Sequence, residues 1–349
     1  MAAILDIVVP VYRGEAETRA CLASLLASRN EHPAHVIVVD DASPEPAITE
    51  HLRALAAQGR IELIRHDANR GFVASVNEAL ARHPERDVVL LNSDTEVAPG
   101  WLDRLAAHAA REARVATVTP FSNNATILSY PRPLVPNPLP EGETTPSLDA
   151  AFAAANAARS VDIPTAVGFC MFVSRRCLDE VGAFDESRYG LGYGEEVDFC
   201  MRAGRAGFRH LAAGDVFVRH VGEVSFGAAG VERRTQAQAT VDALYPEFQV
   251  RLAAFLGGDP LAQLRRRVDL ERLRRSPRRR VLLLGRPASP DAAAPDREKL
   301  RLERVAGSGL RLRWARPGEA YAEDFRGLGG WARLLGRLAR LGVRRIARA

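Results

Sequence analysis

The first 120 residues alternate short runs of β-branched and apolar residues with longer stretches that place Leu, Ala and Val at helical spacing. The short runs predict strands, and the stretches between them predict helices. This alternation is typical of a parallel sheet covered by helices. We therefore expect an α/β fold of the nucleotide-binding kind, with strands at residues 5–11, 35–40, 61–65, 87–92 and 115–118 and helices at residues 15–28, 47–58, 72–83 and 101–112.

The segment that follows is more varied. Residues 131–140 read PRPLVPNPLP, which cannot form a helix or a central strand, so we expect a long surface loop that continues to about residue 146. Loops of this length in a compact domain are often functional. Beyond the loop, the pattern predicts helices at residues 149–158, 176–181, 194–206 and 233–256, and strands at residues 165–173, 208–211 and 215–220.

The two parts of the chain differ in charge. Residues 261–349 carry 24 Lys and Arg against 9 Asp and Glu, a net charge of +15, whereas residues 1–260 have a net charge of −10. The basic part shows a lone strand at residues 281–284 and an Arg/Leu amphipathic helix at residues 331–348. So few elements in ~70 residues are hard pressed to form an independent core. We expect a folded domain at residues 1–257 and a helical, Arg-rich appendage at residues 258–349.

Composition and cysteine usage point to a globular protein of a reducing compartment. The chain is 47% hydrophobic and 26% charged, which excludes a disordered or fibrous protein. No apolar run approaches the ~18 residues that a membrane span needs, and the first residues show no signal peptide. The four cysteines lie far from one another in apolar or helical contexts, without the spacing of a zinc or disulfide framework. We expect a cytoplasmic protein with buried, reduced thiols.

Polar residues follow four of the predicted strands, where α/β folds bind their ligands. They form one set at the carboxyl ends of the strands: Pro10 and Tyr12, then Asp40, Asp41 and Ser43, then Asn69, Gly71 and Phe72, then Asn92, Ser93 and Asp94. A strand-end carboxylate can accept hydrogen bonds from a nucleobase and a ribose. Because a hard divalent cation prefers carboxylate and phosphate oxygens, Asp94 with Glu96 or His220 could hold such an ion.

An acidic string at residues 193–202 is the most informative feature of the second half. Glu195 and Glu196 open a predicted helix, where the helix dipole favours anions. Asp198 and Arg202 are four residues apart, a spacing at which they can form an ion pair. One of the two glutamates then remains to act as a general base. His220 ends a strand, where a histidine is either a structural residue or a metal ligand.

Seven strings, taken together, show a family resemblance. The chain resembles an inverting family 2 glycosyltransferase of the GT-A fold, close to the rhamnosyltransferase-like branch, over residues 4–227. The resemblance implies a mixed, mainly parallel sheet flanked by helices. The matching strings are IVVPVY at residues 7–12, VVDDAS at 38–43, NRGF at 69–72, LLNSD at 90–94, GAFDE at 182–186, GEEVDFCMR at 194–202 and His220.

The resemblance assigns a role to each residue of the predicted site. Pro10, Tyr12, Asp40 and Asp41 would hold the nucleobase and ribose, and Asn69, Gly71 and Phe72 would shape the nucleotide pocket. Asp94 matches the last residue of the family's DxD motif, Ser93 the middle one, and Asn92 stands where the first Asp often is. Glu196 matches the family's catalytic Asp, with Glu195 beside it, and His220 matches a frequent ligand of the Mg²⁺ or Mn²⁺ cofactor.

The resemblance implies an inverting transferase. It would move a sugar from a nucleotide-diphosphate donor, such as a UDP- or dTDP-sugar with rhamnose as one candidate, to a hydroxyl of a glycan or lipid-linked acceptor in cell-surface polysaccharide synthesis. A sugar nucleotidyltransferase is a second hypothesis. It needs a glycine-rich triphosphate loop after the first strand, where the chain instead reads PVYRGE.

The basic appendage carries a third hypothesis, a protein that binds a membrane surface or nucleic acid on a non-catalytic scaffold. Its few aromatic residues and the lack of a nucleic-acid module argue against nucleic acid. Peripheral association with an anionic membrane, at the inner face of the plasma membrane, would bring an enzyme to a lipid-linked acceptor. Residues 280–285, 310–314 and 334–346 are also faintly similar to the opening of a GT-B glycosyltransferase domain, which suggests a truncated second domain.

Overall fold

The computed structural model describes residues 4–111, 113–222, 229–284, 297–305, 309–314, 321–343 and 345–348. The chain divides into two compact units. The first unit comprises Met1–Ala153 and Ala157–Pro260, and the second comprises Ala154–Asn156 and Leu261–Ala349. We describe each unit by itself.

The first unit contains the large sheet. Its strands are β1 (Leu5–Val11), β2 (Ala34–Asp40), β3 (Glu62–Arg65), β4 (Val88–Leu91), β5 (Thr95–Glu96), β6 (Val115–Phe121), β7 (Ser160–Asp162), β8 (Cys170–Val173), β9 (Arg209–Phe217) and β10 (Arg219–His220). Its helices are α1 (Glu15–Ala27), α2 (Pro46–Ala57), α3 (Phe72–Leu80), α4 (Trp101–Ala109), the 3₁₀ turn η1 (Thr126–Leu128), α5 (Thr145–Asn156), α6 (Arg175–Val181), α7 (Glu186–Tyr189), α8 (Glu195–Arg205), α9 (Ala229–Leu244) and α10 (Pro246–Gly258).

Eight strands form one mixed sheet in the order β3-β2-β1-β4-β8-β6-β9-β7. The first four are parallel, β8 is antiparallel to both of its neighbours, β9 is parallel to β6, and β7 is antiparallel to β9. A separate two-stranded sheet pairs β5 with β10, so that Thr95 lies opposite His220. This small sheet brings the segment after β4 beside the end of β9.

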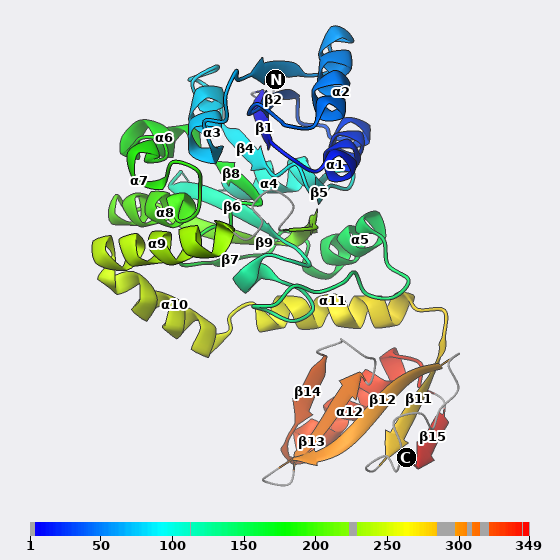
Figure 1. Cartoon of the computed structure of the whole chain (residues 1–349). Coiled ribbons are helices and arrows are strands. Elements are labelled where there is room, and N and C mark those ends of the chain that lie inside the picture. Colours follow the sequence, from blue (N-terminus) through cyan, green and yellow to red (C-terminus); the bar gives the residue numbers. More distant parts are fainter. Residues whose placement is uncertain are drawn as a thin grey trace. The chain divides into compact units, whose positions relative to one another are not determined.

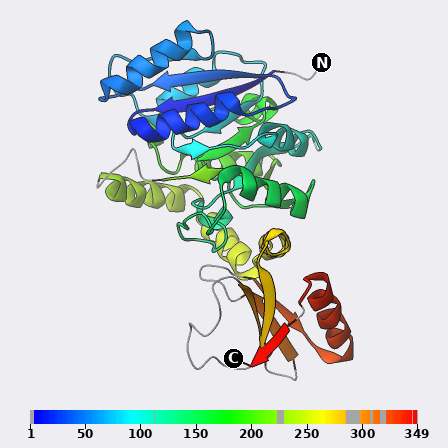
Figure 2. The same ribbon diagram turned by 90° about the vertical axis from the view of Figure 1, so that its right-hand side faces the viewer.

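Helices cover both faces of the large sheet (Figure 1). Alternate residues of a strand point to opposite faces, and Val8 of β1 faces a hydrophobic cluster built with residues of α3, α6 and α8. Figure 2, which views the molecule from the right-hand side of Figure 1, shows α1 and α5 in front of the strands. The nucleotide-binding α/β pattern predicted from the alternation is therefore present.

Several boundaries differ from those expected. The five predicted strands of the first 120 residues are all present, but β5, β7 and β10 are too short to show a period in the sequence. The predicted helix at residues 101–112 ends at Ala109, and Glu112 lies outside the described residues. The strands expected at residues 208–211 and 215–220 are one continuous β9 followed by β10. The family resemblance was expected over residues 4–227. The last part of that stretch, residues 223–227, lies outside the described residues.

The second unit has a sheet and a core of its own. Its elements are α11 (Ala262–Arg275), β11 (Arg279–Leu284), β12 (Arg297–Val305), β13 (Gly309–Trp314), β14 (Ala322–Phe325), α12 (Gly327–Arg340) and β15 (Arg345–Arg348). The five strands form a mixed sheet in the order β14-β13-β12-β11-β15. A cluster of ten buried residues, Leu300, Leu312 and Trp314 among them, joins this sheet to α11 and α12. Buried Glu298 accepts hydrogen bonds from Trp314 Nε1 at 2.9 Å and Ser276 Oγ at 2.6 Å.

Two expectations for the second unit were wrong. The unit was expected to be helical and too poor in elements for a core, but Leu alternates with Arg along β12 and β13 and gives each strand an apolar face. The helix expected at residues 331–348 is α12, which ends at Arg340, and the last described residues form β15, parallel to β11. The apolar face of α12 packs on the sheet through Leu334 and Leu338.

Two expectations can be checked directly. Within the residues that the structure describes, no helix is both long and apolar enough to span a bilayer. All four cysteines are free and buried, as predicted.

Candidate active site

A cavity of about 1060 Å³ lies at the carboxyl ends of β1, β2 and β4. The structure brings almost the whole predicted site to it. The predicted residues that line the cavity are Pro10, Tyr12, Asp41, Asn69, Gly71, Phe72, Asn92, Ser93, Asp94, Glu195, Glu196 and His220.

Asp40 is the exception, because it does not line the cavity. It is fully buried, and its carboxylate accepts hydrogen bonds from Ser43 N at 2.8 Å, Thr49 Oγ1 at 2.8 Å and Arg65 Nε at 3.0 Å. These partners belong to the turn after β2, to α2 and to β3. Asp40 therefore holds these three elements together and is not available to a ligand.

Asp41 shapes the cavity wall through the loop before α3. Its Oδ1 accepts hydrogen bonds from His66 Nδ1 and from Arg70 N, both at 2.7 Å, and its Oδ2 accepts from Gly71 N at 2.8 Å. Gly71 has a φ of +89°, and a Cβ there would lie 2.8 Å from Gly190 O. Because a side chain at position 71 would meet backbone, this position needs glycine.

Asp94 and His220 lie beside each other in the lining of the cavity. The distance from Asp94 Oδ1 to His220 Nε2 is 3.4 Å, and Asp94 Oδ2 accepts a hydrogen bond from Gly222 N at 2.8 Å. His220 Nδ1 donates to the carbonyl of Asn124 at 2.6 Å, which leaves Nε2 as the nitrogen that faces Asp94. The second carboxylate considered for this site, Glu96, does not line the cavity and pairs instead with Arg219.

Electrostatics favours the charged pair of Asp94 and His220. Burial would raise the pKa of Asp94, but hydrogen bonding and attraction to His220 outweigh it and lower that pKa. Burial would lower the pKa of His220, but the same contacts with Asp94 raise it above its ordinary value. Both shifts favour the ion pair of a carboxylate and a protonated imidazole.

Two residues that position His220 were missed by the sequence analysis. Asn123 Oδ1 accepts a hydrogen bond from His220 N at 2.9 Å, and Asn123 Nδ2 donates to the carbonyl of Asn137 in the proline-rich loop at 3.1 Å. The ring of Phe169 stacks on His220 with its centroid 5.2 Å away. Asn123 and Asn124 directly follow β6, so the strand-end rule applied to the other strands could have identified them.

The acidic pair opens α8. Glu195 and Glu196 are the first two residues of this helix, after Gly194 with a φ of +87°. The predicted ion pair behind them is confirmed, with Arg202 Nε 2.8 Å from Asp198 Oδ2, and Tyr245 Oη donates to Asp198 Oδ1 at 2.6 Å. These contacts fix the helix, so that its first turn presents both glutamates to the cavity.

The two glutamates differ in their hold on a proton. Burial raises the pKa of Glu195 well above its ordinary value, and the carboxylate of Glu196 raises it further. Burial also raises the pKa of Glu196, but hydrogen bonds from backbone groups at the helix start and from the Glu195 side chain oppose the rise. These effects make Glu195 the more readily protonated of the two and favour Glu196 as the one that accepts a proton.

The cavity mouth carries an unusual number of exposed apolar side chains. Leu134 is 54% exposed, Val135 39%, Leu191 43% and Val221 42%, and all four line the cavity. We call these four residues the apolar rim. They come from the proline-rich loop, from the segment before α8 and from the segment after β10, which converge at the mouth.

Comparisons with known proteins agree with this geometry. The family model described as "Glycosyl transferase family 2" matches residues 6–182, which is half of the chain. The chain belongs to glycosyl transferase family 2. The match runs from β1 to α6 and therefore includes Asp41 and Asp94 of the cavity.

Two curated relatives come from Mycobacterium tuberculosis. A pre-mycofactocin glycosyltransferase is 29% identical over 206 residues, which cover 59% of this chain and only 40% of that protein's length. An N-acetylglucosaminyl-diphospho-decaprenol L-rhamnosyltransferase is 26% identical over 245 residues, which cover 63% of this chain and 76% of that protein.

Two solved structures share the fold. A structure of GalNAc-T7 with UDP, GalNAc and Mn²⁺ has a TM-score of 0.53 at 13% identity, and the match covers 78% of this chain and 55% of that chain. The mannosyltransferase PcManGT from Pyrobaculum calidifontis, in complex with GDP-Man and Mn²⁺, has a TM-score of 0.50 at 17% identity and covers 76% and 73% of the two chains. These likenesses confirm the predicted GT-A fold.

Proposed function

We propose that this glycosyltransferase moves a sugar from a nucleotide-diphosphate donor to a hydroxyl of a lipid-linked acceptor, with inversion at the anomeric carbon. The observation that carries the proposal is that one cavity holds both the Asp94–His220 pair and the carboxylate of Glu196. A transferase of this kind needs a group that stabilises the leaving diphosphate and a base for the attacking hydroxyl.

Glu196 is the residue we assign as the base. Burial raises the pKa of Glu196, which makes it a stronger base than an ordinary glutamate, and a general base is most effective when its pKa lies near the working pH. Glu196 lines the cavity, and its Oε2 is buried without a hydrogen-bond partner among the described residues, so turning this oxygen toward an acceptor hydroxyl would break no hydrogen bond. The side-chain hydrogen bond between Glu195 and Glu196 holds the two carboxyl groups beside each other.

The residues present fit a divalent cation. A carboxylate oxygen and an imidazole nitrogen 3.4 Å apart can both reach one ion at ~2.1 Å, and the hydrogen bond from His220 Nδ1 to Asn124 orients the ring for this. When bound, Mg²⁺ or Mn²⁺ neutralises charge on the departing diphosphate. Asp94 and His220 would hold the ion, and the phosphate oxygens of the donor and water would complete its coordination.

The apolar rim supports an acceptor with an apolar portion. An apolar ligand that covers exposed apolar surface stabilises the complex by ~25 cal/mol for each Å² removed from water. A sugar or nucleotide would place mainly polar groups against the apolar rim. A polyprenyl-type lipid attached to the acceptor sugar would cover it. Polysaccharide synthesis at the inner face of the plasma membrane fits such an acceptor, and the net charge of +15 in residues 261–349 fits peripheral binding to anionic lipid there.

The donor is tested first by thermal stabilisation of the purified full-length protein with UDP, dTDP and GDP, each with and without Mn²⁺. A ligand at 100 times its dissociation constant stabilises the native state by ~2.7 kcal/mol. We expect one nucleotide to stabilise the protein and the metal to strengthen this effect. If none does, the proposed nucleotide-diphosphate donor is refuted.

The acceptor is tested by steady-state transfer to a lipid-linked sugar and to the same sugar without lipid. We expect Leu134→Ser to raise the KM for the lipid-linked acceptor and to leave donor hydrolysis unchanged. Val250→Ser is the matched control, because Val250 is also exposed but belongs to α10 and does not line the cavity. Equal KM values for the two acceptors would contradict a lipid-linked acceptor without affecting the assignment of the donor.

A further inference from the structure

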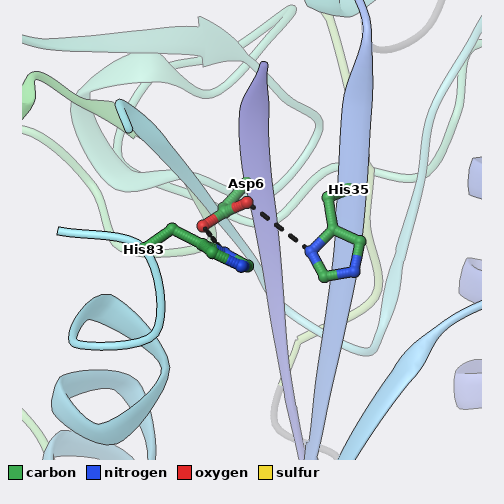
Figure 3. A group of neighbouring side chains, drawn as sticks. All are labelled: Asp6, His35 and His83. Atoms are coloured by element: carbon green, nitrogen blue, oxygen red, sulfur yellow. Dashed lines mark hydrogen bonds and ion pairs between the residues drawn. The ribbon is translucent and has the colours of Figure 1, made fainter. Parts of the chain in front are cut away.

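Three side chains with metal-ligating atoms meet at the end of the large sheet away from the active site. Asp6 lies in β1, His35 lies in β2, and His83 lies between α3 and β4 (Figure 3). Asp6 and His35 are partners in the register of the two parallel strands, so their side chains share a face. Asp6 is buried, whereas both histidines reach solvent.

The ligand atoms of this cluster point toward one another. His83 Nδ1 is 2.8 Å from Asp6 Oδ2, and His35 Nδ1 is 3.7 Å from Asp6 Oδ1. One ligand atom from each residue lies within 4.8 Å of the other two. A zinc ion bound to two nitrogens and one oxygen has bonds of ~2.0–2.2 Å, so the histidines would need to move by only about an ångström.

His35 provides a second, independent observation. Its Nδ1 is buried and has no hydrogen-bond partner within the part of the chain that the structure describes, although the ring edge is exposed. Its other nitrogen, Nε2, lies 3.6 Å from Glu62 Oε2. If Nε2 carries the proton toward Glu62, the lone pair of Nδ1 faces the carboxylate of Asp6. That arrangement leaves the Nδ1 lone pair without a proton donor among the described residues and directs it into the cluster, where it can bind a cation.

We propose that Asp6, His35 and His83 bind a Zn²⁺ ion that ties the amino ends of β1 and β2 to the segment before β4. Two imidazoles and one carboxylate suit zinc, with water as the fourth ligand. Glu62 then orients His35 from behind, as carboxylates commonly do for zinc-bound histidine. Arg86 Nη1 bonds Asp6 Oδ1 at 3.0 Å, so Oδ2 would bind the ion, and the ion would take the place of the hydrogen bond between Oδ2 and His83 Nδ1.

This site is distinct from the catalytic one. Asp6 is five residues before Val11, the end of β1 that borders the cavity, and five residues of strand span about 17 Å. No residue of the cluster lines the cavity. The ion would therefore stabilise the fold and would not take part in sugar transfer.

The test is Zn²⁺ titration of the metal-stripped full-length protein by calorimetry. We expect His35→Gln and His83→Gln each to weaken one Zn²⁺ site at least tenfold, while His220→Gln, at the cavity, and His51→Gln, on α2, leave that site intact.

Two results would overturn the proposal. One is wild-type protein that binds no more zinc than His35→Gln and His83→Gln do. The other is a zinc site that both variants retain at wild-type affinity. If circular dichroism shows that either variant is misfolded, the wild-type protein still decides the question. Zinc must shift the imidazole NMR signals of His35 and His83 and leave those of His51 unchanged, and a spectrum without such shifts refutes the site.

Discussion

Replacing Glu196 with glutamine tests the assignment of the base. The change removes the proton acceptor and keeps the size of a side chain whose Oε2 is buried and unpartnered. General-base catalysis contributes ~10²–10⁴-fold to a rate. We therefore expect kcat to fall by at least ~10²-fold, which corresponds to about 2.7 kcal/mol of transition-state stabilisation. Nucleotide affinity should stay nearly unchanged, because Asp94, His220 and the loop held by Asp41 are intact.

The pH dependence of the wild-type enzyme makes the same prediction sharper. Glu196 works as a base only when it is deprotonated, so activity must fall as the pH drops through its pKa. Because burial raises this pKa, the loss occurs at a higher pH than for an ordinary glutamate. Glu196→Gln should remove this acid limb from the profile of its residual activity. The assay is transfer or donor hydrolysis measured across the pH range.

Glu195→Gln is the matched control. It stands one residue away in the same buried pair and can still donate a hydrogen bond to Glu196, so we expect a smaller loss of kcat and a retained acid limb. Wild-type turnover in Glu196→Gln would remove Glu196 from the mechanism. A large loss in Glu195→Gln alone would transfer the role to Glu195.

Three further predictions concern the metal, the nucleotide pocket and the basic unit. Asp94→Ala and His220→Ala should each weaken metal-dependent nucleotide binding, and EDTA should mimic them; equally tight binding of nucleotide diphosphate in excess EDTA would refute the metal site. Gly71→Ala should lower the free energy of unfolding by ~1–3 kcal/mol, because it strains a positive φ and meets the backbone of Gly190, and an unchanged melting temperature would contradict this. A chain ending at Pro260 should fold and turn over its donor, but it should no longer sediment with anionic liposomes. Salt should weaken the liposome association of the full-length protein, because charges are screened within ~8 Å. An insoluble truncated protein, or equal sedimentation of the two forms, would count against the proposal.

Much of the fold could be predicted because the first strands bury both faces and read as continuous apolar runs. The runs at residues 5–11 and 87–92 correspond to β1 and β4, and the polar residues after them line the cavity. Strands of two or three residues, such as β5 and β10, give no period to detect. In the second unit, Arg side chains on the outer face of β12 and β13 hid the alternation that makes the sheet.

The site could be predicted only as a set of strand ends. The sequence places Asp40 and Asp41 side by side, and it does not reveal that successive residues of the turn point in different directions. Asp40 contacts Thr49 and Arg65, and Asp41 contacts Gly71. The Asp6 cluster was missed for a related reason, since its members meet at the amino ends of strands, where no ligand was expected.

The pairing of β5 with β10 has a consequence for how the enzyme matures. Asp94 and Gly222 are bonded although 128 residues separate them, and His220 reaches Asp94 only because Arg219 and His220 pair with Glu96 and Thr95. Contacts between such distant residues form late, since a long loop must close before they gain anything. On the proposed assignment of Asp94 and His220 as metal ligands, a chain emerging from the ribosome would bind the cation only after β10 has docked. Metal-dependent nucleotide binding would thus indicate that the domain is complete, and partly synthesised chains would not bind the nucleotide donor.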